Sequence, residues 1–183
     1  MKKVVFGGSR KLGKINKAIR EHADNIMTKK YLVLIGDANG ADRAMQEYLA
    51  QKNYPHVIVF CAGNTCRNNI GGWETRFVPS DRKNKDFQHY VIRDKQMVKE
   101  ANYGFMIWDG KSKGTLNQIV NLLEIDKPVL VYFYPKKRSF MLKSSRNLAD
   151  LLSLCDRGII DRLEDSLSLS HRIHPEQLYL NFI

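Results

Sequence analysis

The stretch Ile35-Gly36-Asp37-Ala38-Asn39-Gly40-Ala41-Asp42 decides the fold that this sequence predicts. It follows an apolar run at 31–35 and precedes a segment, 41–49, whose apolar residues recur at helical spacing. A strand that leads through a loop into a helix leaves backbone N–H groups unpaired at the start of that helix, beside the positive end of its dipole. Glycine at 36 and 40 lets the backbone turn tightly and approach a ligand. The loop therefore indicates a site for a phosphate or another anion.

The same order of strand, small-residue loop and helix occurs twice more. A strand within 3–8 ends in Gly7-Gly8-Ser9-Arg10, and a strand at 105–108 leads into Asp109-Gly110-Lys111-Ser112-Lys113-Gly114-Thr115. Two further apolar runs, at 57–61 and 128–133, complete five predicted strands. Apolar strands that alternate with helices are typical of a parallel sheet covered on both faces. The right-handed crossover rule then predicts an α/β protein with a Rossmann-like, doubly wound, mostly parallel five-stranded sheet.

We expect the chain to divide into a Rossmann-like domain at 1–134, which carries the three glycine-bearing loops, and a C-terminal extension at 135–183. Within the domain, residues 62–89 lack periodicity, and we interpret them as an inserted basic loop that also carries Trp73 and Phe77. The extension begins with a basic connector, and its later leucines predict two short amphipathic helices, with a third element after Pro175. These helices are expected to pack on the domain or on a second subunit, which would make the protein a homodimer.

The composition limits the classes of partner that the protein is expected to bind. The formal charge is +11 over 183 residues, which favours a nucleotide, a nucleic acid or an acidic surface, although a basic solvated surface would give the same count. The three cysteines, Cys61, Cys66 and Cys155, lack metal-ligand spacing, so no metal is predicted and a reducing cytoplasm is the expected location. No apolar run approaches the length of a membrane span, so no membrane partner is expected.

Ligands of parallel α/β sheets collect at the carboxyl ends of the strands, where the three glycine-bearing loops should converge. None of the loops contains Gly-x-Gly-x-x-Gly or the Gly-Lys-Ser/Thr of a P-loop, which disfavours classical dehydrogenases and P-loop ATPases. Ordinary turn chemistry would explain any one loop, whereas three together favour phosphate binding. The residues predicted to bind the ligand are Gly7, Gly8, Ser9, Arg10, Gly36, Asp37, Ala38, Asn39, Gly40, Ala41, Asp42, Asp109, Gly110, Lys111, Ser112, Lys113, Gly114 and Thr115.

These motifs, together with Arg93 four residues before Met97 and Trp108 before the last loop, resemble the SLOG superfamily. The similar branch is that of small bacterial and phage domains of unknown function. The Lonely-Guy phosphoribohydrolases and DNA-processing protein A are more distant. The resemblance covers roughly residues 1–134. It implies a nucleotide or NAD-derived ligand at the strand tips, bound by a sensor or a nucleotide-processing protein that requires no further cofactor.

The resemblance also bears on catalysis. In the hydrolase relatives, an Arg four residues before a Met and a Glu three residues after the Gly-Thr pair serve N-glycosidic cleavage. Arg93 matches the first position, whereas Gln118 stands at the second. Glutamine can hydrogen-bond a ribose hydroxyl but cannot take a proton, so binding is better supported than turnover. If this chain does cleave an N-glycosidic bond, Arg93 is expected to act with Asp37 or Asp109.

Two positions, Asp42 and Trp108, have competing interpretations, and so has the function as a whole. Asp42 lies in a first helical turn, where an Asp often only satisfies the helix N-terminus. Trp108 is expected in the core or the pocket wall, with base stacking as the alternative. The second function considered is a nucleic-acid-binding module similar to DNA-processing protein A, which would use the charge, the loop at 62–89 and the connector at 135–146.

Overall fold

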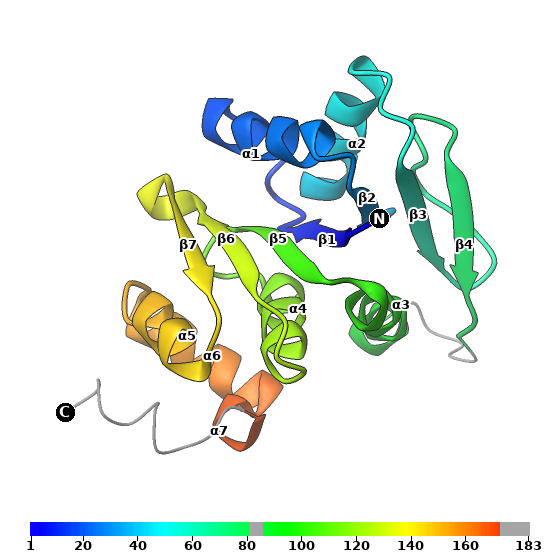
Figure 1. The fold of residues 1–183 in the computed structure, drawn as a ribbon. Helices are drawn as coiled ribbons and strands as arrows, with labels where there is room; N and C mark the ends of the chain where they lie inside the picture. The colour runs from blue at the N-terminus through cyan, green and yellow to red at the C-terminus, as the bar shows by residue number, and fades with distance from the viewer. Residues whose placement is uncertain (81–85, 173–183) are drawn as a thin grey trace.

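The structure is a computed structural model that describes residues 1–80 and 86–172 (Figure 1). It is an α/β protein whose described residues form seven strands and seven α-helices. In chain order the elements are β1 (Lys3–Gly8), α1 (Lys17–Thr28), β2 (Leu32–Gly36), α2 (Ala41–Gln51), β3 (Val57–Ala62), β4 (Glu74–Val78), α3 (Phe87–Glu100), β5 (Tyr103–Trp108), α4 (Lys113–Leu123), β6 (Val129–Phe133), the 3₁₀ turn η1 (Tyr134–Lys136), β7 (Arg138–Leu142), α5 (Ser145–Leu152), α6 (Arg157–Leu167) and α7 (Leu169–Arg172).

One mostly parallel sheet organises the chain. Its strand order is β4-β3-β2-β1-β5-β6-β7, and only β7 runs antiparallel to its neighbour. The central strand β1 lies between β2 and β5, so that Val5 is paired with Leu34 on one side and Gly104 on the other. The carboxyl ends of β1, β2 and β5 therefore lie at the same edge, as the sequence predicted for the three loops.

The prediction of five strands was wrong, because the sheet has seven. One additional strand, β4, lies inside the range interpreted as a basic loop, and the other, β7, lies inside the expected connector. Both are edge strands with exposed or half-exposed residues at most positions. An edge strand has one neighbour and tolerates charged side chains, so it lacks the apolar run that marked the central strands.

Helices cover both faces of the sheet. Figure 1 shows α1 and α2 on one side and α3, α4, α5 and α6 on the other. Successive residues of β1 alternate between the two layers, because Val4 packs in the core under α1 and α2 while Val5 packs in the core with α3 and α4. The central strands are buried on both faces, as expected for parallel sheets.

The C-terminal extension belongs to the second of these layers. The two predicted amphipathic helices are confirmed as α5 and α6, and their leucines Leu148, Leu152 and Leu163 join the core that also contains α3 and α4. The element predicted after Pro175 lies outside the described residues. In the part of the chain that the structure describes, no helix is both long and apolar enough to cross a membrane.

Candidate functional site

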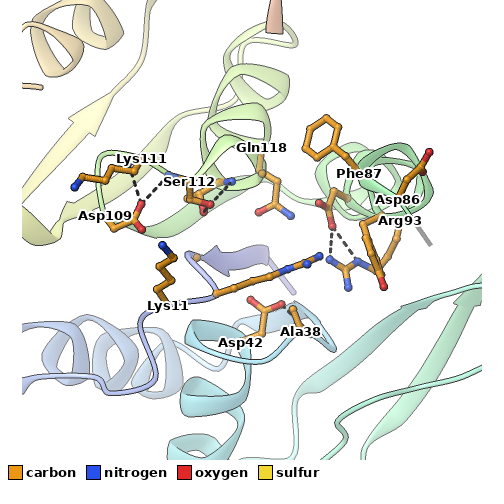
Figure 2. Close-up of a pocket in the computed structure, with 16 residues that line it drawn as sticks. Lys11, Ala38, Asp42, Asp86, Phe87, Arg93, Asp109, Lys111, Ser112 and Gln118 are labelled. Atoms are coloured by element: carbon orange, nitrogen blue, oxygen red, sulfur yellow. Dashed lines mark hydrogen bonds and ion pairs between the residues drawn. The ribbon is translucent and has the colours of Figure 1, made fainter. Parts of the chain in front are cut away.

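A cavity of about 420 Å³ opens at the carboxyl ends of the central strands (Figure 2). The predicted residues that line it are Gly8, Arg10, Ala38, Asp42, Arg93, Asp109, Lys111, Ser112, Gly114, Thr115 and Gln118. Sequence reasoning missed Lys11, Asp86, Phe87, Tyr90 and Asp94, which also line it. The remaining predicted residues, Gly7, Ser9, Gly36, Asp37, Asn39, Gly40, Ala41, Gly110 and Lys113, are outside the lining. The loops thus converge as expected, with some members facing the cavity and others supporting it.

One side of the cavity, the α4 wall (residues 109–118), is built by local hydrogen bonds. Asp109 Oδ1 accepts the backbone N–H groups of Lys111 at 3.0 Å and Ser112 at 2.7 Å, which closes the turn before α4. Ser112 is the N-cap of α4, and its Oγ accepts the Thr115 N–H at 3.4 Å and the Thr115 hydroxyl at 3.0 Å. At Gly114, in the first turn, a β-carbon would meet no heavy atom within 4 Å. The start of α4 is therefore a formed and accessible helix N-terminus.

The loop after β1 ties this wall to the middle of the sheet. Ser9 is buried, and its Oγ accepts the Asp109 N–H at 3.1 Å and lies 3.5 Å from Thr115 Oγ1. A β-carbon at Gly7 would overlap the amide of Gln118, so glycine at that position leaves the space that Gln118 occupies. Ser9 and Gly7 thus support the α4 wall from outside the cavity lining, whereas the side chain of Gln118 lines the cavity.

The opposite side, the α2 wall (residues 36–42), is held by charges from distant segments. The carboxylate of Asp37 is 2% exposed and accepts three hydrogen bonds from Arg67: from the backbone N–H at 3.0 Å, from Nε at 3.1 Å and from Nη2 at 2.6 Å. Arg93 Nη1 donates a fourth at 2.5 Å. Burial alone would raise the pKa of Asp37, but the hydrogen bonds and charges of Arg67 and Arg93 outweigh it and hold the pKa below its usual value. Asp37 is therefore an ionised anchor outside the cavity lining.

Backbone geometry completes the α2 wall. Gly40 adopts φ +84°, and a β-carbon there would overlap the backbone of Arg10, so only glycine allows the two loops to approach so closely. The side chain of Asn68 donates to the Asp37 carbonyl at 2.8 Å and to Asn39 Oδ1 at 3.0 Å. The segment that carries Arg67 and Asn68 therefore supports the wall from behind.

Arg93, on α3, lies between the acidic groups of the site. It is 4% exposed, its Nε and Nη2 donate to Asp94 Oδ1 at 2.9 and 2.7 Å, and its Nη1 donates to Asp37. Although burial opposes the charge, Asp94, Asp42 and Asp37 raise the pKa of Arg93. Three of its N–H groups are used within the protein, so the arginine that the family resemblance nominated joins the α2 wall to α3.

Asp42 differs from the other carboxylates of the site. It is 5% exposed, lines the cavity and accepts the Ala38 N–H at 3.3 Å. Burial raises its pKa to about 7, the charge of Arg93 opposes that rise, and the nearby Asp94 and Asp37 add to it. Asp42 is thus a buried cavity carboxyl whose pKa lies well above the usual value of an aspartate.

The aromatic residues at the other end of the cavity come from α3. The Tyr90 ring has the guanidinium carbons of Arg10 at 4.8 Å and Arg67 at 4.6 Å from its centroid, and Lys113 Nζ lies 4.3 Å from the Phe87 centroid. The helical spacing of Phe87, Tyr90, Asp94 and Met97 is the signal that could have found this face. Trp108 is fully buried and donates Nε1–H to the Ser112 carbonyl at 3.1 Å, which places it in the core, outside the cavity lining.

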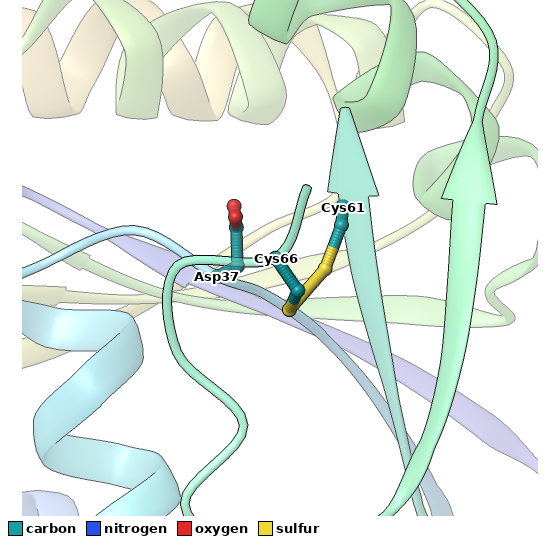
Figure 3. Close-up of side chains that lie close together, drawn as sticks. All are labelled: Asp37, Cys61 and Cys66. Atoms are coloured by element: carbon teal, nitrogen blue, oxygen red, sulfur yellow. A yellow bond between two sulfur atoms is a disulfide. The ribbon is translucent and has the colours of Figure 1, made fainter. Parts of the chain in front are cut away.

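Cys61 and Cys66 form a disulfide beside Asp37 (Figure 3), with Cα atoms 5.2 Å apart. The expectation of reduced thiols is therefore corrected for this pair, whereas Cys155 is free. The two sulfurs and an Asp37 oxygen lie within 4.8 Å of one another, a spacing that suits a metal ion. Because Asp37 is paired with two arginines and the sulfurs are bonded to each other, these three groups offer no available ligand set in this state.

No family model, no curated protein and no solved structure matches this chain. The chemistry of the cavity is therefore what indicates its ligand.

Proposed function

We propose that this chain is a SLOG-type protein with a Rossmann-like domain, which binds a nucleotide or an NAD-derived ligand between the α2 wall and the α4 wall. The observation that carries the proposal is the pairing of an accessible helix N-terminus with an aromatic surface in one cavity of about 420 Å³. A nucleotide has both an anionic and a flat aromatic end, and cavities of roughly 300–1,000 Å³ are typical of small-molecule sites.

The anionic end of the ligand fits the α4 wall. Figure 2 shows Lys11 and Lys111 on either side of Asp109 at this end of the cavity, next to Ser112. The free space at Gly114 lets a phosphate approach the first N–H groups of α4. Helix N-terminus and ammonium groups together favour a phosphate over a neutral ligand.

The flat end of the ligand fits the α3 side, where Phe87 and Tyr90 line the cavity. Figure 2 shows Phe87 at the end away from Lys111. The guanidinium group of Arg10 lies over the Tyr90 ring and Arg10 also lines the cavity, so its planar guanidinium offers a surface on which a nucleobase can stack.

The proposed role is binding, as in a sensor, in preference to turnover. Asp37 and Asp109, the two acids nominated for catalysis, are held by hydrogen bonds within the protein. Gln118 lines the cavity where the hydrolase relatives have a Glu, and an amide cannot supply the negative charge of that mechanism. A phosphoribohydrolase-like reaction would therefore need a different acid.

Nucleic-acid binding remains the alternative proposal, and the structure gives it less support. The arginines of the predicted basic loop are partly neutralised, because Arg67 pairs with Asp37 and Arg76 pairs with Glu74 and Glu100. Binding of a labelled oligonucleotide that weakens steeply with salt would favour the alternative, since each phosphate contact releases counterions.

A thermal-shift titration with AMP, NAD and ADP-ribose tests the leading proposal. We expect at least one of them to raise the melting temperature, because a ligand that binds the native state stabilises it. The Gly114→Asp variant should keep the melting temperature of the free protein and lose the ligand shift, since it places a carboxylate against the phosphate. Gly13→Asp is the matched control, because Gly13 is exposed, also meets no atom within 4 Å and lies outside the cavity lining. The absence of any shift at millimolar ligand would refute the proposal.

A further inference from the structure

Asp42 is a buried carboxyl in a cavity suited to an anion, where a second negative charge would be unfavourable. Figure 2 shows Asp42 beside Ala38 on the α2 side, across the cavity from Gln118 of α4. The hydrogen bond from the Ala38 N–H at 3.3 Å is at the long end of the usual range. A carboxylate in the wall of a cavity that takes a phosphorylated ligand would repel it, whereas a carboxylic acid would not.

The charges around Asp42 are already balanced without it. The groups that face it are Asp37 at the end of β2, and Arg93 and Asp94 on α3, with Arg10 of the β1–α1 loop and Tyr90 of α3 lining the same cavity. Within the described residues, the ion pairs of Arg93 are with Asp37 and Asp94, and that of Arg67 is with Asp37.

In these ion pairs two guanidinium groups balance two carboxylates, and neither Asp42 nor the exposed Arg10 is in any of them. If Asp42 were ionised as well, the cluster would hold one buried negative charge without a partner, which is costly in a protein interior. The pKa of Asp42, which burial raises to about 7, agrees with this charge count.

We propose that Asp42 enters the ligand complex as a neutral carboxylic acid and donates its O–H to an oxygen of a phosphorylated ligand, so that the anion and a proton bind together. This inference depends on the proposed function, because it concerns the same cavity. The proton comes from solvent when the free protein is ionised at Asp42, and it stays on the carboxyl in the complex. No covalent bond to the ligand forms or breaks.

The first test needs no ligand. In protein labelled with ¹³C at the aspartate carboxyl carbons, the resonance that disappears in Asp42→Asn should titrate with a midpoint of about 7. An ordinary Asp titrates at about 4. A midpoint below about 5 would overturn the inference, because Asp42 would then be ionised throughout the neutral range.

The second test measures the proton directly. Calorimetric titration of AMP at about pH 8, in two buffers of different ionisation enthalpy, should show close to one proton taken up per AMP, and none in Asp42→Asn. The Kd of the wild type should weaken about fivefold from pH 7 to pH 8, as the protonated fraction falls from about a half to about a tenth. Binding of the AMP monoanion would also take up a proton and weaken with pH, since the second pKa of its phosphate is about 6, so the loss of the slope in Asp42→Asn is what assigns the proton to Asp42.

The Asn variant keeps an N–H donor at the same place, so it should bind AMP with a Kd that is nearly independent of pH in this range. Asp126→Asn is the matched control, since Asp126 is exposed and outside the cavity lining, and it should retain the wild-type slope. AMP binding without proton uptake overturns the inference and leaves the proposed function intact. Failure of AMP to bind at all counts against both, and the carboxyl titration then shows whether Asp42 was assigned correctly.

Discussion

The two walls of the cavity are built in opposite ways. The turn that begins the α4 wall (residues 109–118) is closed by hydrogen bonds between residues no more than three positions apart, as between Asp109 and Ser112, and one neutral hydrogen bond from Asp109 to Ser9 ties it to the loop after β1. The α2 wall (residues 36–42) depends on Arg67 and Arg93, which lie 30 and 56 residues from Asp37 along the chain. Its helix, α2, has Gly40 as N-cap and no capping side chain, whereas α4 is capped by Ser112. The turn of the α4 wall is therefore closed mainly by its own residues, whereas the charges of the α2 wall depend on partners from distant segments.

The largest effect should come from Arg93→Ala, which removes the long-range support of the α2 wall. It leaves Asp37 and Asp94 buried with part of their pairing lost, and loss of one partner of a buried pair costs about 3–5 kcal/mol of unfolding free energy. Urea denaturation followed by circular dichroism measures this cost. Arg93→Lys is the control, and it should recover only part of the loss, because an ammonium cannot reproduce the donors that reach both Asp37 and Asp94. A cost below about 1 kcal/mol would mean that the α2 wall does not depend on this cluster.

A smaller effect should follow from opening the disulfide that anchors the segment with Arg67. Cys61 and Cys66 are five positions apart, and cross-linking so short a loop stabilises the native state by about 2 kcal/mol in the chain-entropy model. We expect Cys66→Ser to lower the free energy of unfolding by about this amount. Dithiothreitol should have the same effect on the wild type and none on Cys66→Ser. The control is Cys155→Ser, at the free thiol, which should keep the wild type's sensitivity to reductant. If reductant leaves the wild type unchanged, the disulfide contributes nothing to the α2 wall.

The smallest effect should come from Ser112→Ala in the locally built α4 wall. Loss of an N-cap costs about 1 kcal/mol of unfolding free energy. Ser144→Ala is the matched control, because Ser144 caps α5 through an equivalent hydrogen bond to Asn147, away from the cavity. Both variants should lose similar stability in urea, and only Ser112→Ala should weaken AMP binding in calorimetry. Equal AMP affinity in the two variants would show that the start of α4 does not contact the ligand.

The same difference between the walls explains which parts of the fold and the site could be predicted from the sequence. Apolar strands followed by Gly36 or Gly110 can be recognised from the local sequence pattern. The central strands and the convergence of their loops were therefore predictable. Strands β4 and β7 were missed, because edge strands carry polar residues. The partners of Asp37 were missed for another reason. Arg67 lies in a segment without periodicity, and its pairing is fixed by the parallel placement of β2 and β3, which no local pattern encodes.

Tyr90 was missed although it lies at helical spacing from Asp94 and Met97. Two residues, Arg93 and Met97, are too few to define which face of a helix lines a site. For Asp42, the sequence could place the residue in a first helical turn but could not show its environment. Its burial and the pairing of the neighbouring acids with Arg67 and Arg93 are properties of the assembled site.

The 56-residue separation between Asp37 and Arg93 also has a consequence for the order of events during synthesis. When the first two strands have left the ribosome, Asp37 is present but both of its guanidinium partners are still to be made. Contacts between residues so far apart along the chain form late and slowly in folding. The pocket can therefore be completed only after α3 and α4 have been synthesised and have docked on the sheet, and a nascent chain that ends before Gln118 lacks part of the lining that would bind its ligand.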